Sequence, residues 1–279
     1  MSNEKKLQKE AMHMLKRTSR TFYIPITFLE PTLKKTVASA YLCMRAIDEI
    51  EDNAMLDSTS KQYLLRETSA LLKKPFNYEV YQQLVEPYKQ QLPEVTLKLG
   101  DWITTCPSGI VKKVQDSTST MALGMANWAE KNWQIKSKKD LDDYTFYVAG
   151  LVGLMLSDIW EWRDGTKTDR ELAVAYGRGL QTVNILRNIH EDQQRGVSFI
   201  PYGWSIDDTF AYAEENLALG NEYMKDIDSR SILLFCKIPL ALANKTLKAL
   251  KNGREKMSRS EVEATIEEIK SSQSTISNF

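Results

Sequence analysis

An apolar repeat of about 3.6 residues runs through nearly the whole chain, and this repeat constrains the fold more than any other feature. It predicts helices over residues 3–17, 31–52, 58–73, 77–91, 95–104, 109–132, 138–163, 169–195, 207–226, 228–252 and 258–271. The segment TFYIPITFLEP, with its two prolines, predicts a break after the first helix. No strand-like alternation, tandem repeat or Ser/Gly linker is visible, so residues 1–279 are predicted to form a single all-α domain.

Composition excludes several classes of function. The 279 residues include only 12 glycines and 8 prolines, which argues against sandwiches, barrels and Gly-rich nucleotide-binding folds. Lys plus Arg and Asp plus Glu both number 37, so no net field attracts nucleic acid, and no nucleic-acid partner is expected. The chain has only two histidines, which argues against a zinc site and against a His-based catalytic triad. Three well-separated cysteines are typical of reduced core residues in a cytoplasmic protein.

The sequence also lacks a recognisable membrane or targeting segment. Its charged first residues contain no apolar stretch of signal-peptide length, and its last residues, EEIKSSQSTISNF, are polar. The longest apolar run, Val148–Leu156, is about half of the roughly 20 residues that a bilayer span needs. A soluble, cytoplasmic protein without a transmembrane anchor is therefore expected.

A first polar stripe follows the helix predicted for residues 31–52. Tyr41, Arg45, Asp48 and Asp52 lie at i, i+4, i+7 and i+11, which places them on one side of the helix. They belong to the run RAIDEIED, in which acids crowd a helix C-terminus, repel one another and oppose the helix dipole. A solvated helix end explains this stripe as well as a binding site does, when the stripe is taken alone.

A second polar stripe follows the helix predicted for residues 169–195. Gln181, Asn184, Asn188 and Asp192 are spaced at i, i+3, i+7 and i+11 among apolar residues, whereas His190 should point away. Each buried amide needs a partner, since an unsatisfied one costs roughly 1–3 kcal/mol. An inter-helix hydrogen-bond network would satisfy them, but two stripes of matching spacing favour a polar cavity with acids on facing walls.

Such a cavity suits a divalent cation and a phosphorylated substrate. Carboxylates without histidine favour Mg²⁺, which proteins usually hold through one or two carboxylates and phosphate oxygens. Arg45 and Arg187 could take the remaining phosphate charge. The implied substrate is a diphosphate that the metal stabilises as a leaving group.

These residues resemble the squalene/phytoene synthase family of head-to-head isoprenyl diphosphate synthases. The segments that carry the resemblance are SRTFY (residues 19–23), DEIED (48–52), YTFYVAGLVG (144–153) and GLQTVNILRNIHEDQQRGVSFIP (179–201), in the order and spacing of the family. The resemblance implies a helical isoprenoid-synthase bundle around a central cavity that binds a prenyl diphosphate, with farnesyl diphosphate expected. It also implies two or three Mg²⁺ ions bridged by diphosphate, and it leaves open NADPH use and contact with a membrane surface.

Carried over residue by residue, the resemblance implies three sets of site residues. The catalytic set is Arg45, Asp48, Asp52 and Asp192. The metal ligands are Asp48, Asp52, Asn188 and Asp192. The substrate-binding set is Ser19, Arg20, Thr21, Phe22, Tyr41, Tyr144, Gln181, Asn184 and Arg187.

Several positions depart from the family pattern. Asn188 stands where the second metal motif has an aspartate, Val197 and Phe199 replace an arginine and a tyrosine, and Lys245 stands where a tyrosine is common. These losses favour a farnesyl diphosphatase, in which water captures the allylic cation and gives farnesol and pyrophosphate. The alternative is head-to-head condensation of two farnesyl diphosphates to squalene or dehydrosqualene, and a second alternative is a non-catalytic prenyl-binding homologue.

Overall fold

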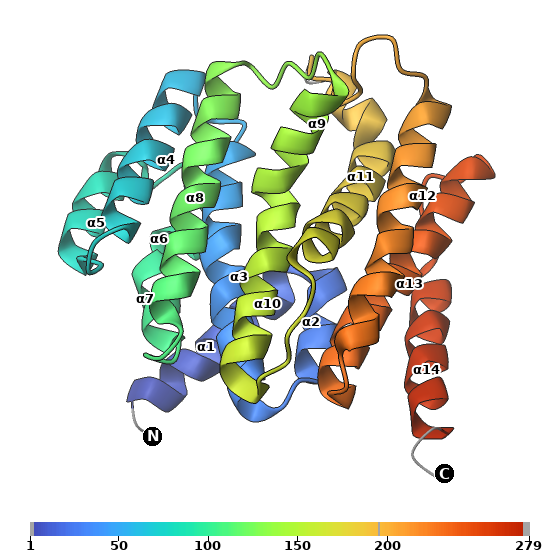
Figure 1. Cartoon of the computed structure of the whole chain (residues 1–279). Helices are drawn as coiled ribbons and strands as arrows, with labels where there is room; N and C mark the ends of the chain where they lie inside the picture. Colours follow the sequence, from blue (N-terminus) through green and yellow to red (C-terminus); the bar gives the residue numbers. More distant parts are fainter. Residues whose placement is uncertain (1–2, 195, 276–279) are drawn as a thin grey trace. The chain divides into compact units, whose positions relative to one another are not determined.

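The structure is a computed structural model that describes residues 3–194 and 196–275, without the side chains of residues 3, 20 and 273–275. All regular secondary structure in this part of the chain is helical, which confirms the predicted all-α class (Figure 1). The residues group into two compact units, Met1–Tyr23 with Pro31–Gln134 and Ile24–Glu30 with Ile135–Phe279. We call them unit 1 and unit 2. The expectation of one domain over the whole chain stays a prediction.

Unit 1 surrounds one long buried helix, α3. Its elements are α1 (Asn3–Thr18), α3 (Pro31–Glu51), α4 (Ser58–Leu72), α5 (Tyr78–Val85), η1 (Glu86–Tyr88), α6 (Glu94–Leu97), α7 (Leu99–Thr105) and α8 (Val111–Glu130). Helices α1, α4, α6, α7 and α8 all contact α3. Hydrogen bonds fix two of these contacts: Thr96 donates to the Ala46 carbonyl at 3.0 Å, and Ser39 donates to the Trp102 carbonyl at 2.7 Å. These contacts fix α3 in the core at Ser39 and at Ala46, just before its acidic end.

Unit 2 is built around α11. Its elements are α9 (Lys138–Thr145), η2 (Phe146–Gly150), α10 (Leu151–Asp164), α11 (Arg170–Gln194), α12 (Ile206–Tyr223), η3 (Met224–Asp226), α13 (Arg230–Lys251) and α14 (Arg259–Thr275). Helices α9, α10, α12 and α13 contact α11, and α12 runs beside it in Figure 1. Ser137 and Ser205 begin α9 and α12 with capping boxes, which explains why these helices start there.

Small residues allow α11 to pack closely on its neighbours. A Cβ on Gly153 would lie 2.2 Å from the Ala173 carbonyl oxygen, and a Cβ on Gly177 would lie 2.4 Å from that of Ala149. Real side chains do not tolerate such distances, so only glycine permits this approach of η2 and α10 to α11. The glycines of the segment 144–153 thus serve helix packing.

The structure corrects the predicted break at residues 21–31. Helix α2 (Arg20–Thr27) occupies most of it, although Pro25 lies inside the helix. Ser19 supplies the start, because its Oγ accepts a hydrogen bond from the Phe22 amide at 3.0 Å, and burial of Ile26 anchors the other end. By the division above, α2 begins in unit 1 and ends in unit 2.

Three predicted helices are interrupted. The helix predicted for 77–91 ends at Val85 and continues as one 3₁₀ turn, that for 95–104 divides at Lys98, and that for 138–163 contains a π-helical turn at Phe146–Gly150. Apolar periodicity does not register such local changes in hydrogen bonding. Among the described residues, none of the helices combines the length and apolar character of a membrane span.

Candidate active site

The polar stripe of α3 is the one partly open strip on its buried stretch. From Thr36 to Glu51 every residue is buried except Tyr41, Arg45, Asp48 and Glu49, which are half-buried. These four positions repeat with the helical period, so they face one direction. From Thr36 to Glu51, the stripe is therefore a polar surface on a helix whose other sides are packed.

Three carboxylates gather where this stripe ends. Asp48, Glu51 and Asp52 each offer an oxygen, and these oxygens lie within 4.8 Å of one another. Burial, and then the nearby charge of Asp52, raises the pKa of Asp48 to about 7 and raises that of Glu51 well above its usual range. Carboxylates so close together and poorly solvated are unfavourable without a cation. The donor set consists of oxygens alone, which fits Mg²⁺.

Arg45 lies beside the three carboxylates and keeps donor capacity. Its guanidinium forms ion pairs with Asp48 and with Glu49. Its Nε is buried and has no hydrogen-bond partner within the described chain. A buried donor next to a cluster of acids is costly unless a ligand oxygen completes it. This unsatisfied donor is what a phosphate group would satisfy.

Glu51 is a site residue that sequence reasoning did not name as a ligand. Its residue surface is only 7% exposed, unlike that of the exposed Asp52. Lys61 of α4 donates to the Glu51 carbonyl at 2.6 Å, and its Nζ lies 5.1 Å from the ring centroid of Trp133. The i+3 spacing from Asp48 was a signal for Glu51, but its burial comes from the packing of other helices around α3.

The SRTFY segment contributes to the same unit. Tyr41 donates from its hydroxyl to the Thr18 carbonyl at 3.3 Å, and burial raises its pKa, which a hydrogen bond with Ser19 opposes. The Phe22 ring lies 6.1 Å from that of Tyr41. Thr21 is exposed. The side chain of Arg20 lies outside the described residues. Ser19, Phe22 and Tyr41 are thus brought together beside Arg45, whereas Thr21 is not.

The second stripe lies on α11 of unit 2. Gln181, Asn184 and Asn188 are half-buried, Asp192 is buried and Arg187 is exposed. Asn184 donates to Gln181 Oε1 at 3.4 Å, and Arg187 Nε donates to Asn188 Oδ1 at 3.2 Å. The amides therefore interact along their own helix. The exposed side chain of His190 is not part of this set.

Tyr144 packs against Phe199, which lies near the end of the segment 179–201. The residue is 6% exposed, and its ring stacks on that of Phe199 at 4.6 Å between centroids and 23° between planes. Phe199 is one of the positions that depart from the family pattern. Its ring supplies the packing surface without a hydroxyl group, so this departure leaves Tyr144 supported.

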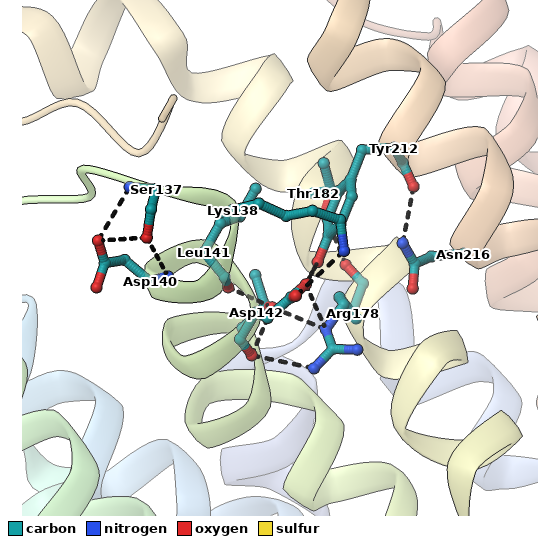
Figure 2. Close-up of polar contacts among 10 residues, drawn as sticks. Ser137, Lys138, Asp140, Leu141, Asp142, Arg178, Thr182, Tyr212 and Asn216 are labelled. Atoms are coloured by element: carbon teal, nitrogen blue, oxygen red, sulfur yellow. Dashed lines mark hydrogen bonds and ion pairs between the residues drawn. The ribbon is translucent and has the colours of Figure 1, made fainter. Parts of the chain in front are cut away.

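Arg178 is the second residue that sequence reasoning missed. It lies one turn before Gln181 on α11. Its guanidinium donates to the Asp142 carbonyl, as Figure 2 shows, and to the Thr145 hydroxyl, both on α9. The i−3 spacing from Gln181 could have identified it. Its partners could not be inferred, because they come from a helix far away in the sequence.

Residues 15–208 match the sequence model of the squalene/phytoene synthase family. This chain belongs to that family. The family processes prenyl diphosphates, so the earlier resemblance is confirmed and an enzyme of isoprenoid biosynthesis is supported. The family is also known to use Mg²⁺ through acidic residues, and the cluster on α3 provides such residues.

Individual relatives agree with this assignment. Squalene synthase of Rattus norvegicus is 29% identical over 86% of this chain and 63% of its own length, and that of Bos taurus is 30% identical over the same shares. The chain thus spans less than two thirds of these curated relatives. A crystal structure of a dehydrosqualene synthase with a ligand aligns with a TM-score of 0.67 at 20% identity, over 98% of each chain, and supports the fold.

These relatives contradict the expectation of a farnesyl diphosphatase. The curated relatives are squalene synthases, and a structural neighbour is a dehydrosqualene synthase. The expectation gave too much weight to single substitutions. Asparagine still offers a carbonyl oxygen to a hard cation, and Phe199 still packs on Tyr144, so the substitutions need not remove the synthase chemistry.

Proposed function

We propose that this protein condenses two molecules of farnesyl diphosphate head to head into a C30 hydrocarbon, in a reaction that depends on Mg²⁺. The observation that carries the proposal is the group Asp48, Glu51 and Asp52 beside Arg45, in a member of this family. The buried Nε of Arg45 lacks a partner among the described residues. The squalene synthase relatives support the C30 product over hydrolysis.

The acidic residues of α3 are proposed to hold the metal. Asp48, Glu51 and Asp52 would supply carboxylate oxygens, and bound Mg²⁺ would neutralise the diphosphate as a leaving group. Arg45 would donate its free Nε to a phosphate oxygen. In unit 2, Asn188 and Asp192 are proposed as further metal ligands, and Gln181, Asn184 and Arg187 as contacts to the substrate.

The proposed reaction has two half-reactions, each of which releases a diphosphate. Loss of diphosphate from one farnesyl diphosphate gives an allylic cation, which the other captures with loss of a proton to form a cyclopropyl C30 diphosphate. This intermediate loses its own diphosphate and rearranges. The C30 cation then takes a hydride from NADPH to give squalene or loses a proton to give dehydrosqualene.

The half-buried apolar residues of η2 and α10 suit a hydrocarbon substrate. Phe146, Val148, Val152 and Leu156 keep part of their surface exposed. Apolar walls exclude water, and water is the competitor that would capture a carbocation. These residues are therefore proposed to protect the cationic intermediates from hydrolysis.

Product analysis tests the proposal. The intact protein is incubated with farnesyl diphosphate and Mg²⁺, with and without NADPH, and the organic extract is analysed by mass spectrometry. A C30 hydrocarbon that is absent after chelation of the metal is expected. Squalene with NADPH and dehydrosqualene without it would also identify the second half-reaction. Farnesol as the sole product, or no turnover, would contradict the proposal.

A further inference from the structure

The π-helical turn η2 changes the hydrogen bonding where α9 gives way to α10. The Leu151 amide donates to the Phe146 carbonyl, five residues earlier, instead of four as in an α-helix. One extra residue is thereby accommodated after Thr145. Such turns are rare and need support from neighbouring groups, because their backbone hydrogen bonding is less regular than that of an α-helix.

Arg178 of α11 supplies that support at the beginning of the turn. Its Nη2 donates to the Asp142 carbonyl at 3.1 Å, and its Nε donates to Thr145 Oγ1 at 3.2 Å. The Thr145 hydroxyl in turn donates to the Leu141 carbonyl at 2.6 Å. Two carbonyl oxygens in the middle of α9, those of Leu141 and Asp142, are therefore bound by the buried Thr145 hydroxyl and by the Arg178 guanidinium, and Figure 2 shows the guanidinium at Asp142.

The Asp142 carboxylate ties this contact to a third helix. Tyr212 of α12 donates to Asp142 Oδ1 at 2.5 Å, while Arg178 Nε lies 3.7 Å from the same oxygen. Lys138 Nζ lies 3.2 Å from Asp142 Oδ2 and 5.4 Å from the centroid of the Tyr212 ring. Burial, and then the hydrogen bond to Asp142, raises the pKa of Tyr212, so its hydroxyl remains a donor. The group joins α9, α11 and α12.

The other end of η2 is fixed against the same helix. A Cβ on Gly150 would lie 2.9 Å from Val174 Cγ1, and Gly177 leaves room only for the Ala149 carbonyl. The turn is thus held on α11 at residues 174–177 and again at Arg178. Tyr144 lies just before the turn, and Gln181 follows Arg178 by one turn of α11.

We infer that Arg178 is a positioning residue, which with Asp142 and Thr145 fixes the register of the turn Phe146–Gly150 and so places Tyr144 and the adjoining apolar wall for the prenyl diphosphate. The inference rests on the proposed function for the identity of the substrate. It assigns Arg178 no contact with the reacting atoms. Loss of the contact should loosen binding and admit water, beyond any effect on stability.

Four variants of the whole protein test this role. Arg178→Met removes the guanidinium, and Thr145→Val removes the hydroxyl from a fully buried side chain at nearly constant shape. Thr145→Ser retains the hydroxyl and serves as the conservative rescue. Arg170→Met is the matched control. Arg170 is the first residue of α11, and its guanidinium pairs with Asp158 of α10 at 2.8 Å, away from the turn.

Binding of farnesyl thiodiphosphate with Mg²⁺ is measured by calorimetry, and product ratios are measured with farnesyl diphosphate. We expect Arg178→Met and Thr145→Val to raise the Kd about tenfold and to increase farnesol relative to C30 product at least about fivefold. Thr145→Ser and Arg170→Met should stay within about twofold of the unmodified protein. Urea melts of all four show how much each substitution costs in stability.

Two outcomes would overturn the inference. One is an unchanged Kd and product ratio in Arg178→Met, and the other is an equal effect in Arg170→Met at similar loss of stability. Failure of the proposed function gives a different result, because the unmodified protein would then make no C30 product. The thiodiphosphate measurements still test Arg178 in that case. If all variants bind the thiodiphosphate equally, or if none of them binds it, the result counts against the positioning role of Arg178.

Discussion

At the scale of single residues, the carboxylates of α3 carry the strongest expectation. Asp48→Ala or Asp52→Ala should lower kcat roughly a hundredfold or more, because under the proposed function each removes a ligand from the ion that stabilises the leaving diphosphate. Steady-state assays with farnesyl diphosphate at varied Mg²⁺ measure this loss. Asp116→Ala provides the control, since the exposed Asp116 pairs with Lys112 one turn earlier on α8. Activity near that of the control in both variants would refute the metal site.

Asn188 gives a second expectation at this scale. Asn188→Asp adds a negative charge to the half-buried stripe of α11, four residues before Asp192. The Mg²⁺ concentration for half-maximal activity should fall about fivefold, which corresponds to about 1 kcal/mol of added attraction. Gln193→Glu adds the same charge at an exposed position of the same helix and should leave the metal requirement unchanged. Equal shifts in both variants would show a general field effect and no ligand at Asn188.

The sequence predicted some site residues and not others for a physical reason. Asp48 and Asp52 follow from spacing along one helix, which is a local property. Glu51 belongs to the same run, but acids at a helix end are usually solvated, and its burial depends on the helices packed around α3. Arg178 is recognisable only with its partners on α9. Local patterns therefore identify candidates, and tertiary packing decides which of them are buried and paired.

At the scale of elements, the close packing of α10 on α11 at Gly153 can be tested. Gly153→Ala should destabilise the protein by about 1–3 kcal/mol and reduce activity, because the new methyl group meets the Ala173 carbonyl and displaces α10 from α11. Urea unfolding and product assays measure both effects. Gly253→Ala is the comparison: its φ of +74° costs about 1 kcal/mol, but open space surrounds the new methyl group and activity should persist. Full stability in Gly153→Ala would contradict the packing claim.

Helices were largely predictable because apolar periodicity reports which face is buried. The long helices α3, α8, α11 and α13 begin and end within a few residues of the expected positions. The exceptions are instructive. Helix α2 contains a proline and is stabilised by the Ser19 cap, and η2 adds one residue to a turn without disturbing the apolar pattern. Both depend on individual hydrogen bonds, which periodicity does not describe.

At the scale of the whole molecule, a neutral chain concentrates charge in a few places. The 37 acidic and 37 basic side chains cancel overall, while three acids gather at the end of α3. Composition correctly excluded a Gly-rich nucleotide-binding fold, and motifs in order identified the family. The expected hydrolytic outcome is contradicted by the squalene synthase relatives. Under the proposed function, the product depends on how well water is excluded from the site. That property belongs to the assembled wall of apolar side chains and cannot be read from single substitutions.

The acidic cluster should also make the stability of the metal-free protein depend on pH. Because the folded state raises the pKa of Asp48 to about 7 and that of Glu51 well above its usual range, the folded protein holds protons that the unfolded chain has released above about pH 4. The free energy of unfolding in EDTA should therefore fall as the pH rises from 5 toward 7 and beyond. Asp48→Asn with Glu51→Gln removes both groups and should flatten this dependence.

Hydrogen exchange can locate this effect in the molecule. Exchange rates of the metal-free protein, divided by the intrinsic rate at each pH, give opening free energies for individual helices. Those of α3 and α4 in unit 1 should decrease between pH 6 and 8, because Asp48, whose pKa is raised to about 7, becomes charged there beside its acidic neighbours. Added Mg²⁺ should reverse the decrease, and the double variant should not show it. A pH dependence that survives in the double variant would place its origin outside the cluster and remove the electrostatic argument for a cation at the end of α3.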